Sequence, residues 1–493
     1  MRRRAARSQT RETATTVLKR TLGHIHLLGI GGAAMAPLAG MLKERGYTVT
    51  GSDTNVYPPA STLLSSLGIS WSEGFRAENL KPVPDLLVVG NAVSRGNPEL
   101  EAALDEKIPY WSMPQALEEL FLPGHTSIVI AGTHGKTTTT ALLAWIFHVA
   151  GRQPDFLVGG VVPNFSDKSY GLGGGEEFII EGDEYDSAYF DKSPKFLHYH
   201  PDDLILTSLE FDHADIYPNL AAIEVQFRQL VNLVPRRGRI LVWGEAPNLV
   251  ACTEKAFCTV ETYGLAPEMD WYAGDIEWRD GMTHFRVAYH AKEVARIRMP
   301  LAGRHNAMNA LACVAMSFSR GVECGAVEAA LAKFQGVRRR LEIKGEAGGV
   351  TVVEDFAHHP TAIRASIEAA RSRWPGRRLW VAFEPRSNTM RRRVFQDELA
   401  GALATADGAV LGPVNRPHLL ADEERLDPQY VIAAIREQGK LGRAFGSSAE
   451  IAEYFSRELA AGDLVMVMSN GSFDGLCGKL LESLRKGTAV RKS

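Results

Sequence analysis

The chain has 493 residues, with 55 basic and 58 acidic side chains that give a net charge of −3. Its length suggests about three domains, since a single hydrophobic core rarely serves more than roughly 250–300 residues. The small net charge excludes an overall electrostatic attraction to nucleic acid or to a membrane surface, so we expect small-molecule partners. We also expect a monomer.

The cysteines and the apolar stretches bear on where the protein works. Five cysteines are spread along the chain without a Cys-x-x-Cys pair, which argues against a disulfide framework or a zinc site and favours the cytoplasm. No apolar stretch approaches the roughly 20 residues that span a bilayer. Residues 1–21 are rich in arginine and threonine and lack the apolar core of a secretory signal. We interpret them as a disordered basic extension; a transit peptide and a start codon assigned too early stay open.

The first predicted domain, residues 22–122, begins with a strand and a glycine-rich loop. Strands are predicted at residues 24–30, 48–53 and 85–90, and a proline-containing boundary lies near residue 123. The loop glycines and the acid that follows them are Gly29, Gly31, Gly32 and Asp53. An acid roughly 20 residues after the glycines matches the dinucleotide-binding fingerprint. Because such a loop holds a diphosphate through backbone N–H groups, NAD and a nucleotide-sugar diphosphate are equal candidates.

The second predicted domain, residues 123–335, contains the strongest motif. The β-branched residues 128–130 predict a buried strand, and apolar positions at helical spacing predict the helix that follows. The loop between them consists of Gly132, Thr133, His134, Gly135, Lys136, Thr137 and Thr138. Backbone N–H groups at a helix start favour a polyphosphate, to which Lys136 adds a charge and Thr137 a hydroxyl for Mg²⁺. Ile130 stands where longer phosphate loops have glycine, which points to a particular branch of ATP enzymes.

Two acidic clusters follow later strands of this region. Residues 181–186 follow a predicted strand at 178–180, and residues 210–215 follow one at 204–207. Alternating strands and helices imply a parallel sheet, whose strand ends line a ligand crevice, so these carboxylates would face the phosphates. Oxygen ligands there suit Mg²⁺. The alternative is a pair of solvated acidic turns.

A helix that begins after residue 303 carries two amides on one face. Asn306 and Asn309 are three positions apart, where their carboxamides could bind an adenine edge. Ordinary capping of the helix start by asparagine fits the pattern equally well. Before this helix, residues 270–300 alternate polar and apolar side chains around Asp280-Gly281, which predicts a hairpin.

The third predicted domain, residues 336–493, repeats the alternation of strands and helices. Its strands are predicted at residues 350–354, 379–383, 409–414 and 464–468. This order is typical of a Rossmann-like α/β domain. Polar loops leave the strands at residues 354–360, 384–389 and 469–475.

Taken in order, the motifs resemble the Mur ligase family over nearly the whole chain from residue 23. The matching features are the short phosphate loop, Glu181, Asp212-His213, His305 with Asn306 and Asn309, Arg339-Arg340 and Asp355. The resemblance implies a three-domain α/β architecture, with a Rossmann-like N-terminal domain, a central phosphate-loop ATPase domain and a Rossmann-like C-terminal domain. It also implies an ATP-dependent ligase that forms an amide and binds UDP-sugar, ATP and the incoming amine on successive domains.

Within the family, the chain is similar to members that act on UDP-N-acetylmuramate. Residues 24–34 and His358-His359-Pro360 resemble that branch. Residues 51–59, 90–92, 95–98, 212–216 and 384–390 resemble the enzymes that attach the tripeptide L-Ala-γ-D-Glu-meso-diaminopimelate in murein recycling. The alternative is the branch that adds L-alanine in peptidoglycan biosynthesis, which has a different loop at the last of these positions.

The resemblance implies a role for each candidate residue. Besides the phosphate loop, ATP would contact His305, Asn306, Asn309, Arg340 and Asp355. The UDP-sugar would contact Gly29, Gly31, Gly32, Asp53 and Asn91, and the peptide Arg386, Ser387, Asn388 and Thr389. Mg²⁺ would bind at Thr137, Glu181 and His213. The candidate catalytic residues are Lys136, His213 and His358, the last as the base that deprotonates the amine.

Three further points narrow the choice. The tripeptide carries three carboxylates, so its site should be cationic, and the planar guanidinium of Arg386 suits such recognition. A carbamylated lysine, present in other branches, is not expected, because Arg228 occupies its position and no lysine lies between Lys195 and Lys255. A nicotinamide dehydrogenase would leave the phosphate loop unexplained, and a nucleotide switch would leave the first glycine loop unexplained.

Overall fold

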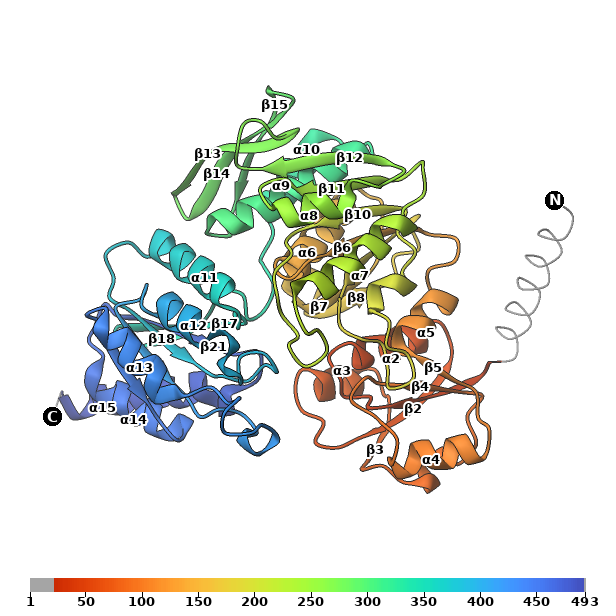
Figure 1. The fold of residues 1–493 in the computed structure, drawn as a ribbon, viewed down its shortest axis with the longest axis horizontal. Helices are drawn as coiled ribbons and strands as arrows, with labels where there is room; N and C mark the ends of the chain where they lie inside the picture. Colours follow the sequence, from red (N-terminus) through yellow and green to blue (C-terminus); the bar gives the residue numbers. More distant parts are fainter. Residues whose placement is uncertain (1–21, 492–493) are drawn as a thin grey trace, which may run out of the picture. The chain divides into compact units, whose positions relative to one another are not determined.

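The computed structural model describes residues 22–491 (Figure 1). These residues form two compact units. Within the described residues, the first unit comprises residues 22–209, 223–263 and 312–330, and the second comprises residues 210–222, 264–311 and 331–491. The basic extension predicted at residues 1–21 lies outside the described part. Among the described helices, none is long and apolar enough to cross a membrane.

A five-stranded parallel sheet begins the first unit, with strand order β3-β2-β1-β4-β5. The strands are β1 (His24–Leu28), β2 (Thr48–Asp53), β3 (Trp71–Glu73), β4 (Leu86–Val89) and β5 (Tyr110–Ser112). The helices are α2 (Met35–Glu44), α3 (Ala60–Ser66), α4 (Pro98–Asp105) and α5 (Met113–Leu120). The predicted strand at residues 48–53 is confirmed. The first strand ends at Leu28 rather than at residue 30, because Gly29 turns the backbone with a φ of +80°.

The phosphate loop belongs to a second sheet of the first unit, in which the strands run β12-β11-β10-β6-β9-β7-β8. The strands are β6 (Thr126–Ala131), β7 (Asp155–Val162), β8 (Lys168–Gly171), β9 (Glu177–Gly182), β10 (Asp203–Leu206), β11 (Arg239–Trp243) and β12 (Thr259–Gly264). All neighbours are parallel except β7 and β8. Since β6 lies between β9 and β10, Ile128, Val129 and Ile130 are fully buried, as expected for an interior parallel strand.

Five helices belong to the central stretch of sequence. They are α6 (Lys136–Val149), α7 (Leu220–Leu233), α8 (Pro247–Thr253), α9 (Arg304–Ser319) and α10 (Cys324–Ala332). In the second unit, β13 (Trp271–Arg279), β14 (Met282–Tyr289) and β15 (Lys292–Met299) form consecutive antiparallel pairs. The predicted hairpin is confirmed, because Asp280 and Gly281 make the turn between β13 and β14 with φ of 53° and 75°.

A six-stranded sheet forms most of the second unit, with order β16-β17-β21-β18-β19-β20. The strands are β16 (Glu342–Ala347), β17 (Val350–Asp355), β18 (Leu379–Phe383), β19 (Gly408–Leu411), β20 (Leu441–Ala444) and β21 (Leu464–Met468). The helices are α11 (Pro360–Arg373), α12 (Gln396–Leu403), α13 (Pro428–Glu437), α14 (Ser448–Glu458) and α15 (Leu476–Arg491). Only the β16–β17 pair is antiparallel.

Both faces of this third sheet are buried. Alternate residues of a strand point to opposite faces: Val381 and Phe383 pack in one apolar core with α11, α12 and α13, and Trp380 and Ala382 pack in another with α14 and α15. The predicted α/β class with Rossmann-like first and third sheets is therefore confirmed. The domain boundaries at residues 122 and 335 stay predictions.

Candidate active site

The phosphate loop connects β6 to α6 and needs glycine at two positions. Gly132 has a φ of +143°, and a Cβ atom there would lie 2.2 Å from the hydroxyl oxygen of Thr207. Gly135 precedes the helix with a φ of +82°, in the left-handed region that side chains disfavour. Backbone conformation therefore favours glycine at both positions predicted for ATP binding, and close packing also requires it at Gly132.

Thr207 and Ser208, which directly follow β10, hold the loop in place. Ser208 accepts the N–H of Thr133 through its carbonyl oxygen at 3.1 Å and that of His134 through its hydroxyl at 2.8 Å. The hydroxyl of Thr207 donates to the carbonyl oxygen of His134 at 2.5 Å. Ser208 was not among the predicted site residues, although it directly follows the predicted strand at residues 204–207.

Lys136 lies, mostly but not fully buried, among acidic side chains. Its ammonium donates to the carbonyl oxygen of Gly132 at 2.6 Å and to the carboxylate of Glu184 at 2.7 Å. Burial alone would lower the pKa of Lys136, but Glu184, Asp183 and Glu181 more than offset it and hold the pKa above its ordinary value. Lys136 therefore stays charged, as its predicted role at a phosphate requires. Glu184 was not predicted individually, although it lies in the acidic cluster at residues 181–186.

Thr137 and Glu181, both predicted to bind Mg²⁺, lie together in the first unit. The Thr137 hydroxyl donates to Oε1 of Glu181 at 3.0 Å, and Oε2 of Glu181 accepts the N–H of Gly159 at 2.8 Å. Burial raises the pKa of Glu181, a cost that a bound cation would relieve. In octahedral Mg²⁺ sites, ligands at about 2.1 Å place neighbouring oxygens about 3.0 Å apart, so this pair fits the ion.

Residues at the end of β2 accept hydrogen bonds from the first glycine loop. Asp53 accepts the N–H of Gly31 at 2.8 Å, and the carbonyl oxygen of Ser52 accepts that of Gly29 at 2.8 Å. Asn91, another predicted UDP-sugar contact, donates to Asp186 at 3.1 Å. The Asp53 carboxylate therefore shapes the loop, a use that the fingerprint alone does not specify.

In the second unit, the acidic segment 210–215, which includes His213, contacts the loop that follows β18. Oδ1 of Asp212 accepts the Thr389 hydroxyl at 2.6 Å, and Asp215 accepts the Asn388 amide at 2.7 Å. Burial would raise the pKa of Asp212, but the nearby histidines and the Thr389 hydroxyl hold it well below its usual range. Asn388 and Thr389 thus bind the acidic segment 210–215; their predicted contact with the peptide stays a prediction.

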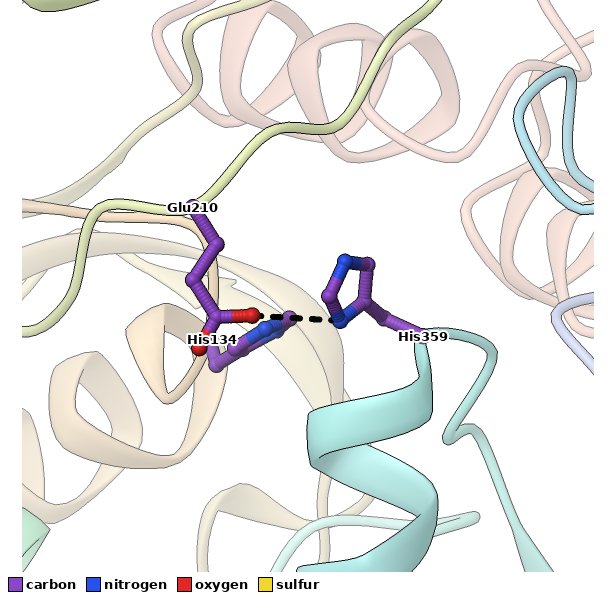
Figure 2. Close-up of side chains that lie close together, drawn as sticks. All are labelled: His134, Glu210 and His359. Atoms are coloured by element: carbon purple, nitrogen blue, oxygen red, sulfur yellow. Dashed lines mark ion pairs between the residues drawn. The ribbon is translucent and has the colours of Figure 1, made fainter. Parts of the chain in front are cut away.

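A histidine outside the predicted set joins the same segment. Figure 2 shows the ion pair between Glu210 and His359, in which Nδ1 of the imidazole lies 3.3 Å from Oε2 of the carboxylate. Thr361, at the start of α11, also donates to Glu210, at 2.7 Å. The His-His-Pro motif indicates this position only through the resemblance, because the acidic partner Glu210 is distant in sequence; Thr361, for example, lies 151 residues from it.

The ring of Phe356 brings together two other predicted residues. Arg340 lies over it at 4.9 Å from the ring centroid, and His358 meets it edge-on at 5.5 Å. The His358 ring nitrogen Nδ1 donates to the carbonyl oxygen of Phe356 at 3.0 Å. Asp355 accepts the N–H groups of Leu341 and Ala357, both at 2.8 Å, so its carboxylate shapes this loop.

The amides at the start of α9 make local contacts. The Asn306 side chain donates to the backbone carbonyl oxygen of Ala302 at 2.8 Å, and the Asn309 side chain donates to Oδ1 of Asn306 at 3.4 Å. Both asparagines lie inside α9 and donate here, whereas a capping side chain accepts a backbone N–H, so capping and an adenine contact both stay predictions. Burial, assisted by Arg340, lowers the pKa of His305 to about 4, so this imidazole is neutral at pH 7.

Arg386 and Ser387 follow β18 in the loop predicted to bind the peptide. The guanidinium of Arg386 lies 3.6 Å from the carboxylate of Glu384, and Ser387 accepts the N–H of Met390 at 3.1 Å. Glu384 is also hydrogen-bonded to Ser469, which follows the neighbouring strand β21. A cation and a carboxylate therefore stand side by side at the ends of adjacent parallel strands, where ligands bind in such sheets.

Three family models match successive parts of the chain. They are the catalytic domain of the Mur ligase family at residues 24–123, the Mur ligase middle domain at 130–317 and the Mur ligase glutamate ligase domain at 339–471. The chain belongs to the Mur ligase family. The predicted family and its three-domain α/β architecture are confirmed, and this family of ligases uses ATP.

Two Mur ligase relatives cover almost the full length. UDP-N-acetylmuramate--L-alanyl-gamma-D-glutamyl-meso-2,6-diaminoheptandioate ligase of Escherichia coli (strain K12) is 41% identical, over 94% of this chain and 98% of the relative. UDP-N-acetylmuramate--L-alanine ligase of Chlorobium phaeobacteroides (strain BS1) is 33% identical, over 94% and 98%. The crystal structure of a murein peptide ligase from Psychrobacter arcticus 273-4 matches with a TM-score of 0.73 and 37% identity, over 94% of this chain and 99% of that one.

Proposed function

We propose that this Mur ligase joins L-Ala-γ-D-Glu-meso-diaminopimelate to the carboxyl group of UDP-N-acetylmuramate and converts ATP to ADP and phosphate. The identity of 41% with the Escherichia coli enzyme, against 33% with the Chlorobium L-alanine ligase, supports the tripeptide as the amine. The observation that carries the ATP chemistry is the contact of Lys136 with Glu184 at 2.7 Å beside the Thr137–Glu181 pair. The reaction belongs to peptidoglycan recycling, and its cytoplasmic location stays a prediction.

The chemistry needs activation of a poor electrophile. A carboxylate resists attack by an amine because its charge is delocalised and its oxygen leaves badly. Transfer of the γ-phosphoryl group of ATP to the carboxylate oxygen gives an acyl phosphate and ADP. The free α-amine of the peptide then forms the C–N bond, loses a proton, and displaces inorganic phosphate.

Lys136 is the residue that would stabilise charge during phosphoryl transfer. Its ammonium now contacts Glu184, and in the complex we expect it to contact the γ-phosphate, whose charge spreads over the transferring oxygens. Thr137 and Glu181 would hold Mg²⁺, which when bound supplies further neutralisation of phosphate charge. His213 is the candidate ligand of a second Mg²⁺, although imidazole suits this ion less well than oxygen.

The amine must lose its proton, and His358 is the candidate base. Its Nδ1 donates to Phe356, which fixes the ring, so Nε2 is the nitrogen that could accept a proton. For the peptide carboxylates, Arg386 is the candidate partner, and its guanidinium already lies 3.6 Å from the carboxylate of Glu384. A carboxylate and a guanidinium together suit the zwitterionic end of diaminopimelate.

The alternative function is ligation of L-alanine. It is separated from the proposal by kcat/KM for L-alanine and for L-Ala-γ-D-Glu-meso-diaminopimelate with the same UDP-N-acetylmuramate. We expect the tripeptide to be favoured by at least about tenfold, because loss of a desolvated charge partner costs about 2–5 kcal/mol. Arg386→Ala should weaken the tripeptide reaction and leave the KM for ATP unchanged.

Arg364→Ala provides the matched control, since this exposed arginine of α11 donates only to the carbonyl oxygen of Glu398, at 3.3 Å, among the hydrogen bonds of the described residues. It should leave both amine substrates unaffected. Equal or better use of L-alanine by the wild-type protein would assign it to the biosynthetic branch.

A further inference from the structure

One stretch of the first unit touches both the phosphate loop and the N-terminal sheet. We call residues 184–200, between β9 and β10, the strap. At its start, Glu184 accepts the Lys136 ammonium at 2.7 Å. Two residues later, Asp186 accepts the amide of Asn91 at 3.1 Å, from the loop that follows β4. Lys192, within the strap, covers the other oxygen of Asp186 at 2.6 Å.

Aromatic side chains extend this contact along the N-terminal sheet. Phe190 meets the ring of Tyr110 in β5 edge-on, with centroids 4.9 Å apart. Tyr189 packs against the apolar core of that sheet, which includes Leu28 and Val89. The strap is therefore attached to the N-terminal sheet by both polar and apolar contacts, although it belongs by sequence to the ATP-binding region.

Four titratable side chains, linked in a row by hydrogen bonds, attach the strap to α5. Nε2 of His198 lies 2.7 Å from Asp191, and its Nδ1 lies 2.7 Å from Oε2 of Glu118. The second oxygen of Glu118 lies 2.7 Å from Nε2 of His200. We call these four residues the clasp. Since both ring nitrogens of His198 face carboxylates, the geometry is that of an imidazolium that donates on both sides.

The surrounding charges favour this protonated form. Burial would lower the pKa of His198, but Glu118 and Asp191 more than offset it and raise the pKa above its ordinary value of 6.5. The pKa of His200 is also raised, by Glu118 and Glu119, against burial and repulsion from His198. Burial would raise the pKa of Glu118, yet the two histidines lower it to about 2.

We propose that His198 is a positioning residue: as an imidazolium it fastens the strap to α5 and so holds the UDP-sugar sheet in register with the phosphate loop. This inference rests on the proposed function, because it assigns UDP-N-acetylmuramate to that sheet. The strap residue that contacts Lys136, Glu184, is only two positions from the one that contacts Asn91, Asp186. Displacement of the strap therefore disturbs the sugar site. The phosphate loop keeps its own contacts with Ser208.

The sign of the pH dependence follows from the raised pKa. The attachment is complete while His198 is protonated, and it weakens as the pH rises through the raised pKa of the imidazole. Affinity for UDP-N-acetylmuramate should therefore fall on the alkaline side in the wild-type protein. In His198→Gln, which keeps a planar polar group without the charge, that fall should disappear, and the affinity should stay at the weaker value.

The test is calorimetric titration of the full chain with UDP-N-acetylmuramate, and separately with ATP, between pH 6 and pH 9. At pH 7 we expect His198→Gln to bind UDP-N-acetylmuramate about tenfold more weakly, which corresponds to about one pKa unit of coupling. ATP binding should change less than about twofold. His200→Gln should show a smaller loss, because His200 contacts Glu118 alone among the clasp carboxylates.

His418→Gln is the matched control, since His418 is an exposed histidine of the second unit. If His198→Gln fails to fold, Phe190→Ala tests the same strap through its contact with Tyr110, and selective loss of UDP-N-acetylmuramate binding is again expected. Unchanged binding and an unchanged pH profile in His198→Gln would overturn this inference alone, as would an equal loss of ATP binding. A wild-type protein that binds no UDP-N-acetylmuramate would overturn the proposed function together with it.

Discussion

Two glycine loops of the first unit share one backbone design. Each follows a buried parallel strand and leads into a helix, and in each a neighbouring strand supplies a side chain that accepts a loop N–H. In the first loop, Asp53 accepts the N–H of Gly31 at 2.8 Å. In the second, Ser208 accepts the N–H of His134 at 2.8 Å. Both loops could present backbone N–H groups to phosphate oxygens.

The two loops differ in their charged side chains. In the second loop, Lys136 contacts Glu184, and Thr137 and Glu181 lie close by. The first loop, residues 29–34, contains no basic residue. A loop without a cation can hold a diphosphate but offers little to a phosphoryl group in transfer. The backbone therefore gives both loops the design of an anion site, and we expect their side chains alone to distinguish catalysis at the second loop from binding at the first.

The largest effect should come from removing the cation of the second loop. Lys136→Ala should lower kcat by about 10³-fold, because a positioned charge on the transferring group is lost. The variant should also melt at a lower temperature, since Glu184 loses the cation that it contacts. The measurement is phosphate release with saturating ATP, next to a thermal melt.

Lys168→Ala is the control for this change. Lys168 pairs with Glu44 at 3.2 Å on the surface and has no place in the loop, so its removal should leave kcat intact. Near-normal ligation by Lys136→Ala would mean that the phosphate-loop assignment is wrong.

The second effect concerns the metal ligands. Glu181→Gln should weaken the apparent affinity for Mg²⁺ by about 100-fold, because a neutral amide replaces the anionic oxygen beside Thr137. Raising the Mg²⁺ concentration should recover part of the activity. Glu177→Gln is the matched control: Glu177 is a buried acid of the same strand, paired with Arg152, and its loss should lower stability without changing the Mg²⁺ requirement.

The features that the sequence could predict are those set by residues close together in the chain. The strands at residues 379–383 and 464–468 were predicted with their observed bounds, because buried apolar runs between turns are a local signal. The phosphate loop was also recognisable, since Gly132, Gly135, Lys136 and Thr137 are close in sequence. Patterns within about ten residues were therefore enough to predict these strands and the residues of the phosphate loop.

The partners of these loops could not be predicted in the same way. Ser208 meets His134 across 74 residues, and Glu184 meets Lys136 across 48. Such pairs depend on which strands are neighbours, and strand order is a tertiary property. For the same reason Asn388 and Thr389 were assigned to the peptide alone, although the structure shows them bound to Asp215 and Asp212.

The third prediction tests the first loop. Asp53→Ala should weaken binding of UDP-N-acetylmuramate by about tenfold, because the charged acceptor for the Gly31 N–H is lost. Binding of ATP should not change, since Lys136, Thr137 and Glu181 keep their contacts. Calorimetric titration with each nucleotide separates the two effects. Tight binding of NADH that UDP-N-acetylmuramate does not displace would reassign this loop to a dinucleotide.

The smallest effect should come from the corresponding acceptor of the second loop. Ser208→Ala removes the hydroxyl that accepts the His134 N–H at 2.8 Å, but the Ser208 carbonyl oxygen still accepts the N–H of Thr133 at 3.1 Å. A neutral hydrogen bond contributes about 1 kcal/mol, so the KM for ATP should rise about fivefold. The KM for UDP-N-acetylmuramate should stay constant, the reverse of the Asp53→Ala pattern. Together, the two variants test whether each acceptor affects only the ligand of its own loop. If Ser208→Ala raised the KM for UDP-N-acetylmuramate as much as the KM for ATP, the two loops would not act as separate anion sites.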